Sequence, residues 1–99
     1  MLKKGFNLTE LQEYIKNKDF KPDQAMNYFY KLIEEVGELS EVLRKNKRIV
    51  EPGNIKGTIE EELTDVLYYV AAIANIYEIN LEENFHLKEE INKVKWSNK

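Results

Sequence analysis

Long stretches without proline or glycine are the feature that most restricts the fold of this chain. Both prolines lie at or before residue 52, and glycines occur only at positions 5, 37, 53 and 57. Between these breakers, apolar residues recur at intervals of three and four, which is the spacing of one face of an α-helix. The chain is therefore predicted to be all-α, with a single domain over residues 1–99 and no strand.

The first half of the chain is predicted to form two helices. Asn7 and Glu10 have the spacing of a capping box and are followed by apolar residues at helical intervals, which predicts a helix over residues 8–17. Pro22 suits the first turn of a second helix, whose apolar positions continue to about Lys45. This second helix is long and amphipathic.

The second half is predicted to form two further helices after a loop. Residues 46–57 contain Pro-Gly and have no periodic pattern, which is typical of a loop. Thr58 can cap a third helix that ends near Glu78. After Asn80, the spacing of Leu81, Phe85, Leu87, Ile91 and Val94 indicates a fourth helix ending in a polar tail.

Acidic residues interrupt the apolar faces of the two longest predicted helices. When each residue is advanced by about 100° around the helix axis, Glu35 and Glu38 fall on or beside the apolar face of the second helix. Glu62 and Asp65 fall in the same way on the third helix, with Glu62 in the middle of the face. Glu34 projects from the opposite, solvated side. Each helix therefore offers a pair of inward acids three residues apart.

Four inward acids require a positive counter-charge, because a buried ionised carboxylate without a partner is strongly destabilising. Lys31 lies on the same arc, but no Lys or Arg occurs between Lys56 and Lys88. Oxygen ligands suit hard cations, so about two Mg²⁺ or Mn²⁺ ions are the expected counter-charge. One acid pair alone is common on a solvated helix face. It is the presence of both pairs within apolar faces that favours a metal site.

The same acids form a signature. Residues 34–38 read EEVGE and residues 62–65 read ELTD, which is the order EExxE, spacer, ExxD. The flanking segments KLIEEVGEL and EELTDVLYYVAAIAN, followed by INLEE, fit the same pattern. Over about residues 11–95 the chain resembles the MazG-like nucleotide pyrophosphohydrolases of the all-α NTP pyrophosphatase superfamily.

This resemblance implies a reaction and a ligand set. The reaction is Mg²⁺-dependent hydrolysis of a nucleoside triphosphate at the α–β bond, giving the monophosphate and pyrophosphate, with Mn²⁺ as a possible substitute and removal of damaged nucleotides as a possible role. Glu35, Glu38, Glu62 and Asp65 would be the metal ligands, the same four acids that the helical register turns inward. Glu34 would support the ligands or act as a base.

Four other residues are candidates for substrate binding. Lys31, Lys88 and Lys95 could hold phosphates, although a single lysine is more often a solvated surface residue. Tyr69 lies one turn after Asp65 on the same face, where it could contact substrate or serve as a core tyrosine.

Composition restricts the partners and the compartment. The net charge is −3 with no basic stripe, so a nucleic acid is not an expected partner. There is no cysteine, which excludes disulfides and thiol nucleophiles. The N-terminus has no apolar signal-type core, and the longest apolar run is far too short to span a membrane, so a cytoplasmic location is expected.

The third predicted helix also indicates assembly. It is apolar nearly all round, and three other short helices in a chain of 99 residues can hardly enclose it. We therefore expect a four-helix unit that completes its bundle as a homodimer or a dimer of dimers, an assembly that the resemblance also implies.

Two other functions are compatible with the sequence. A phosphoribosyl-ATP pyrophosphatase-like enzyme would use similar acids on a different nucleotide. A non-enzymatic helical module would self-associate through residues 66–74 and keep its acids for solubility. Dependence of activity on magnesium distinguishes the enzymes from the module.

Overall fold

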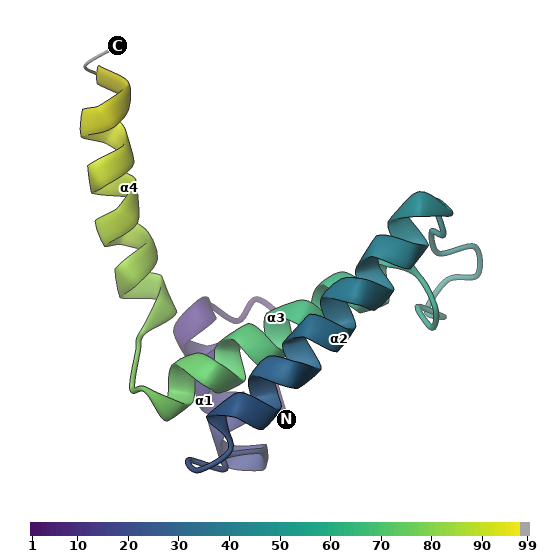
Figure 1. Ribbon diagram of the computed structural model, residues 1–99, viewed down its shortest axis with the longest axis horizontal. Helices are drawn as coiled ribbons and strands as arrows, with labels where there is room; N and C mark the ends of the chain where they lie inside the picture. Colours follow the sequence, from purple (N-terminus) through teal and green to yellow (C-terminus); the bar gives the residue numbers. More distant parts are fainter. Residues whose placement is uncertain (98–99) are drawn as a thin grey trace.

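Four α-helices make up most of the residues that the computed structural model describes, which are residues 1–97 (Figure 1). The helices are α1 (Leu8–Lys18), α2 (Ala25–Arg44), α3 (Ile59–Ile76) and α4 (Leu81–Ser97). Residues 1–97 contain no strand, so the prediction of an all-α chain is confirmed. None of the described helices has the length and apolar content needed to cross a membrane.

The caps predicted for the first and third helices are present. The Asn7 side chain accepts a hydrogen bond from the backbone N–H of Glu10 at 2.8 Å, and the Glu10 side chain accepts one from the Asn7 N–H at 3.0 Å. At the start of α3, Thr58 Oγ1 accepts a hydrogen bond from the backbone N–H of Glu61 at 3.2 Å. These bonds satisfy N–H groups that have no partner within the helix.

The prediction that Pro22 lies in the first turn of the second helix is wrong. Pro22 precedes α2, in a turn closed by a hydrogen bond of 3.0 Å from the Gln24 N–H to the Lys21 carbonyl. Proline favours the second position of such a turn because its ring fixes φ at a suitable value. The helix therefore begins only at Ala25.

α2 and α3 both end in a Schellman motif whose left-handed residue is not glycine. After α3, the Ile79 N–H donates to the Ala74 carbonyl at 2.9 Å and the Glu78 N–H donates to the Asn75 carbonyl at 3.2 Å. Glu78 has a φ of 54°, and Asn46 occupies the equivalent position after α2 with a φ of 51°. This geometry ends α3 slightly before the predicted end near Glu78.

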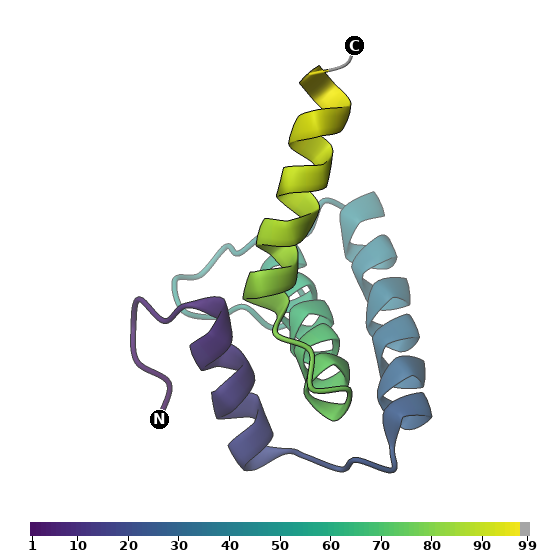
Figure 2. The ribbon, with the colours of Figure 1, turned by 90° about the vertical axis from the view of Figure 1, so that its left-hand side faces the viewer.

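α2 and α3 run antiparallel and side by side, and α1 packs against α3 (Figure 1; Figure 2). The buried core lies among these three helices and contains Ile15, Tyr28, Ala71 and Ala72. Because two of these residues are alanines of α3, neighbouring helices can approach α3 closely.

A buried amide pair joins α1 to the connection between α3 and α4. Gln12 Nε2 donates to Asn75 Oδ1 at 3.1 Å, and Asn75 Nδ2 donates to the Gln12 carbonyl at 2.9 Å. Gln12 Oε1 in turn accepts a hydrogen bond from the Leu81 N–H at 2.8 Å, at the first residue of α4. These bonds tie the start of α4 to the core.

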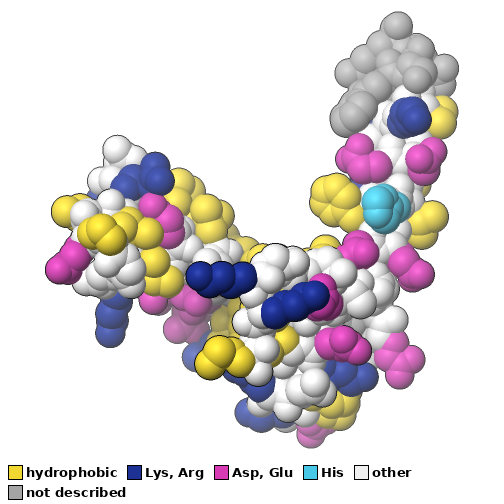
Figure 3. Space-filling view, turned by 180° about the vertical axis from the view of Figure 1, so that it is seen from behind, with side chains coloured by type: hydrophobic (Ala, Val, Ile, Leu, Met, Phe, Trp, Pro, Cys, Tyr) yellow, Lys and Arg dark blue, Asp and Glu magenta, His cyan; other side chains and the backbone are white. Residues whose placement is uncertain are grey.

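Beyond this joint, α4 extends away from the other helices and contacts mainly α1 (Figure 2). The radius of gyration is 15.8 Å, against about 13 Å for a compact domain of roughly 100 residues. In Figure 3, apolar side chains lie along α4 among acidic and basic ones. Four of them are between 61% and 66% exposed: Phe85, Leu87, Ile91 and Val94.

We expect the substitution Glu78→Gly to stabilise the fold, because glycine adopts a positive φ without the steric penalty of a Cβ. The gain should be about 1 kcal/mol, which corresponds to a rise in melting temperature of roughly 4–8 °C in a small domain. Asn46→Gly is the control and should change the melting temperature less, because asparagine tolerates this conformation. An unchanged or lower melting temperature for Glu78→Gly would contradict the argument.

Candidate metal centre

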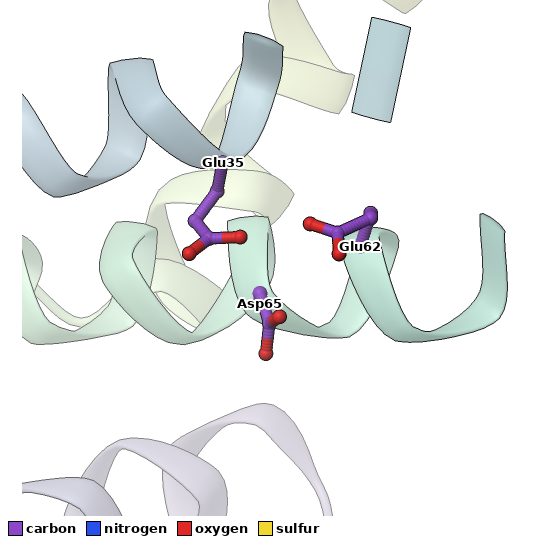
Figure 4. A group of neighbouring side chains, drawn as sticks. All are labelled: Glu35, Glu62 and Asp65. Carbon is purple, nitrogen blue, oxygen red and sulfur yellow. The ribbon is translucent and has the colours of Figure 1, made fainter. Parts of the chain in front are cut away.

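Three acids from two helices converge at the interface of α2 and α3. Glu35 extends from α2 toward α3, the helix that carries Glu62 and Asp65 (Figure 4). One carboxylate oxygen from each residue lies within 4.8 Å of those of the other two. Since two of the acids are three residues apart on one helix and the third faces them from the antiparallel helix, the backbone itself brings the carboxylates together.

The carboxyl groups of this cluster are poorly satisfied by the protein. Glu62 is only 6% exposed, and Glu35 and Asp65 are partly buried. Glu35 Oε2 and Glu62 Oε2 are both buried without a hydrogen-bond partner. A buried oxygen without a donor is destabilising, whereas a cation would satisfy both atoms. The cluster therefore has the donor type, spacing and open valences that suit a hard divalent ion.

Burial and mutual repulsion raise the pKa values of all three acids. The pKa of Glu35 rises to about 8, first because of burial and then because of the neighbouring carboxyl groups of Glu62, Glu38 and Asp65. Burial also raises the pKa of Glu62, although the hydrogen bond with Glu35 partly offsets this rise. The pKa of Asp65 is raised by burial and by the charges of Glu61 and Glu38. Without a cation, the cluster therefore favours protonated carboxyls.

The two other acids predicted from the sequence, Glu38 and Glu34, are both exposed. Glu38 is exposed, but its carboxyl group is near enough to Glu35 and Glu62 to raise the pKa values of both, so it lies at the open edge of the cluster. Glu34 is exposed, as its register predicts, and forms an ion pair of 3.6 Å with Lys31. The helical register thus agrees with the structure for Glu35, Glu62, Asp65 and Glu34, whereas Glu38, which was predicted to face inward, is exposed.

The predicted substrate-binding residues fall into two groups. Lys31 and Tyr69 line a cavity beside the acids. Lys88 and Lys95 are exposed on α4, which points away from the α2–α3 pair (Figure 1). A single chain does not bring these two lysines to the acidic cluster.

The sequence reasoning missed an acid that organises the aromatic side chains near the site. Asp19, directly after α1, accepts hydrogen bonds from the hydroxyls of Tyr28 at 2.7 Å and Tyr68 at 2.9 Å. These bonds connect α1 to α2 and α3. Asp19 lies outside any periodic segment, so only the spacing of the tyrosines on the predicted helices could have suggested a shared partner.

Comparison with known proteins assigns the family. Residues 23–96 match the family model of the MazG nucleotide pyrophosphohydrolase domain. The chain belongs to the MazG nucleotide pyrophosphohydrolase family. Hydrolysis of a nucleotide is therefore its class of reaction, and both acidic motifs lie inside the matched region.

Two crystal structures of iMazG from Vibrio DAT 722 are similar to this chain. The Ctag-iMazG structure is 54% identical with a TM-score of 0.83, covering 89% of this chain and 99% of that chain. The Ntag-iMazG structure is 55% identical with a TM-score of 0.84, covering 91% of this chain and 97% of that chain. No curated protein matches the chain.

The raised pKa values predict how the stability of the metal-free MazG domain depends on pH. A carboxyl whose pKa is higher in the folded state stabilises the fold below its unfolded pKa, near 4.5, and this contribution is lost as pH rises through the folded pKa, about 8 for Glu35. In EDTA, the melting temperature should therefore fall between pH 5 and pH 8. Millimolar Mg²⁺ should restore it at pH 8, where the ligands can ionise.

Glu35→Gln is the matched variant for this measurement, because it removes the ionisable group and keeps the shape of the side chain. Its melting temperature in EDTA should vary less over the same pH range. If the wild-type melting temperatures in EDTA are the same at pH 5 and pH 8, and Mg²⁺ does not change them, the acids neither have raised pKa values nor bind the metal.

Proposed function

We propose that this chain is a Mg²⁺-dependent nucleoside triphosphate pyrophosphohydrolase that cleaves (d)NTP to (d)NMP and pyrophosphate. The observation that carries the proposal is the acidic cluster, in which two buried carboxylate oxygens have no hydrogen-bond partner. This cluster lies within the region that matches the nucleotide pyrophosphohydrolase family. Removal of damaged or non-standard nucleotides is a role compatible with this activity.

In this proposal Glu35, Glu38, Glu62 and Asp65 hold the metal. Three of these acids already lie together, and Glu38 adjoins them at the open edge of the cluster. The bound ion would supply charge neutralisation of the triphosphate and activation of a water molecule. Mn²⁺, which accepts the same oxygen ligands, is a possible substitute.

Glu34, Lys31 and Tyr69 are proposed to act around this metal centre. Glu34 follows the solvated side of α2, so its proposed role is to support the neighbouring ligand Glu35 in the chain or to take up a proton through solvent water. The Lys31 ammonium is available for a phosphate oxygen, because its ion pair with Glu34 is exposed and weak. Tyr69 is half-buried and lines the cavity beside the acids, where it can contact the substrate.

We propose further that the enzyme is a homodimer or a dimer of dimers. On α3, Leu63 and Leu67 are 53% and 43% exposed, and α4 leaves its apolar side chains largely uncovered. Such extensive apolar exposure is typical of an interaction surface. Packing against a second copy would bury these residues, and it would allow Lys88 and Lys95 of one copy to approach the acids of another.

Light scattering at micromolar concentration tests this assembly. We expect a mass of at least twice the 11.8 kDa of one chain. The double substitution Leu87→Glu and Ile91→Glu should weaken the assembly, because it places two charges on the exposed apolar part of α4. Lys4→Glu, at an exposed position before α1, is the control for the same change in net charge. A monodisperse wild-type monomer would contradict the proposal.

Glu62→Gln tests the catalytic role of the acids. This change keeps the shape of the most deeply buried acid of the cluster but removes its charge, so it should lower turnover by about two orders of magnitude or more by weakening metal binding. The fold should persist, because the substitution relieves repulsion among carboxylates. Pyrophosphate release from standard and damaged (d)NTPs at millimolar Mg²⁺ is the measurement.

Glu41→Gln is the control for this experiment. Glu41 lies on the same helix as two proposed ligands, but its ion pairs with Arg44 and Lys45 are on the surface. Its replacement should change turnover only slightly. Equal activity of Glu62→Gln and wild type would favour the self-association module, whereas cleavage of phosphoribosyl-ATP in preference to every (d)NTP would favour the related pyrophosphatase.

A further inference from the structure

A cavity of about 440 Å³, lined by Lys31 and Tyr69 among others, lies beside the acidic cluster. Its volume is within the range of about 300–1,000 Å³ that is typical of small-molecule sites. The lining comes from the end of α1, the turn before α2, the first half of α2 and the middle of α3, and it includes Asp19, Gln24, Asn27, Tyr28, Lys31 and Tyr69.

The cavity continues the seam between α2 and α3 by one helical turn beyond the acids. Lys31 precedes Glu35 by four residues on α2, and Tyr69 follows Asp65 by four residues on α3. Because the helices are antiparallel, both steps lead in the same direction, over a distance of about 6 Å along the axes. Tyr69 is close enough to the acids for the charges of Glu35 and Asp65 to act on its hydroxyl. A molecule in the cavity can therefore reach the metal centre.

The aromatic side chains of the cavity are held rigidly. The Tyr28 hydroxyl donates to Asp19, and the ring centroids of Tyr28 and Tyr69 lie 6.4 Å apart. Tyr68 supports this arrangement from behind, because its hydroxyl also donates to Asp19 and its ring contacts Tyr69 edge-on at 5.2 Å. Such a preorganised aromatic surface suits a planar, partly apolar group.

The charges that line the cavity balance one another. Two lysines, Lys21 and Lys31, are opposed by two acids, Asp19 and Glu34. Lys31 pairs with Glu34, and Lys21 lies near Asp19. A polyphosphate would require an excess of positive charge. The one ammonium proposed for a phosphate oxygen, Lys31, lies a single turn from Glu35, and the rest of the lining offers no such excess. An uncharged group is therefore the better fit.

Two amide side chains supply hydrogen-bonding groups at this site. Asn27 Nδ2 donates to Gln24 Oε1, and both residues line the cavity. After this bond, the pair still has free N–H donors and free lone pairs on the carbonyl oxygens. Amides of this kind form paired hydrogen bonds with the edges of nucleobases.

We propose that this cavity binds the nucleoside part of the substrate, with the Tyr69 ring, supported by buried Tyr28, along the base and the amides of Gln24 and Asn27 reading its edge. This inference rests on the proposed function, because the α-phosphate would lie at the acidic cluster one turn away. Asn27 is accordingly a specificity-determining residue, whereas the acids act on the phosphates.

Asn27→Ala tests the proposal, with Asn17→Ala at an exposed position of α1 as the matched control. Loss of base contacts should raise the KM for the preferred (d)NTP about tenfold. The kcat should stay within about twofold, because the metal ligands are untouched. The ratio of kcat/KM between different bases should change. Inhibition by inorganic tripolyphosphate, which has no nucleoside, should be the same in wild type and variant.

Two results would overturn the inference while leaving the proposed function intact. One is an unchanged KM and base preference in Asn27→Ala. The other is a parallel loss of tripolyphosphate inhibition, which would mean that the cavity holds phosphates.

Calorimetric titration in EDTA with the four deoxynucleoside monophosphates separates the inference from hydrolysis. Binding by wild type that is lost in Asn27→Ala would support the nucleoside cavity even if no (d)NTP were cleaved, in which case the proposed function alone would fail. If neither hydrolysis nor monophosphate binding is observed, both proposals are wrong.

Discussion

The constraint that shapes the rest of this structure is the placement of carboxylates from α2 and α3 within 4.8 Å of one another. In an ordinary helix pair these positions would hold apolar side chains, which would stabilise the contact without any ion. Here the acids are buried and repel one another, and both effects raise their pKa values and destabilise the ionised cluster. The acids make the α2–α3 interface less stable than an apolar one and also make it attractive to a cation. Such a loss of stability is common where a functional site lies in a packed interface.

The rest of the fold compensates for this weak point. Thr58 caps α3 directly before the acids, so the helix that carries Glu62 and Asp65 begins at a defined residue. Farther along the same helix, Asn75 is locked to Gln12 of α1 by paired hydrogen bonds. α3 is thus fixed at both ends, which holds the acids between these ends at a defined spacing.

The fold class and three inward acids, Glu35, Glu62 and Asp65, could be predicted because both follow from the 3.6-residue period of single helices, whereas Glu38 lies at the margin of its apolar face and is exposed. Rotation about one axis is sufficient to turn Glu62 inward and Glu34 outward, and no long-range contact alters that result. The turn at Pro22 could not be predicted in the same way, since proline suits both a turn and a first helical turn. The role of Asp19 could not be predicted either, because its carboxylate accepts hydrogen bonds from tyrosines on two different helices. The periodic pattern of one helix does not show which residues of other helices lie near it.

The direction of α4 is the other feature that local sequence does not determine. It depends on the Gln12 side chain, which accepts a hydrogen bond from the Leu81 N–H at the first residue of the helix.

The direction of α4 divides the roles of the helices in the proposed enzyme. The proposed metal ligands all come from α2 and α3, so one chain can assemble the metal centre by itself. Lys88 and Lys95 lie on α4, which points away from the acids of its own chain, so their proposed contact with a phosphate requires the proposed assembly of copies. Assembly would then affect substrate affinity more than metal affinity, because it adds cations around the triphosphate without changing the carboxylates that hold the ion.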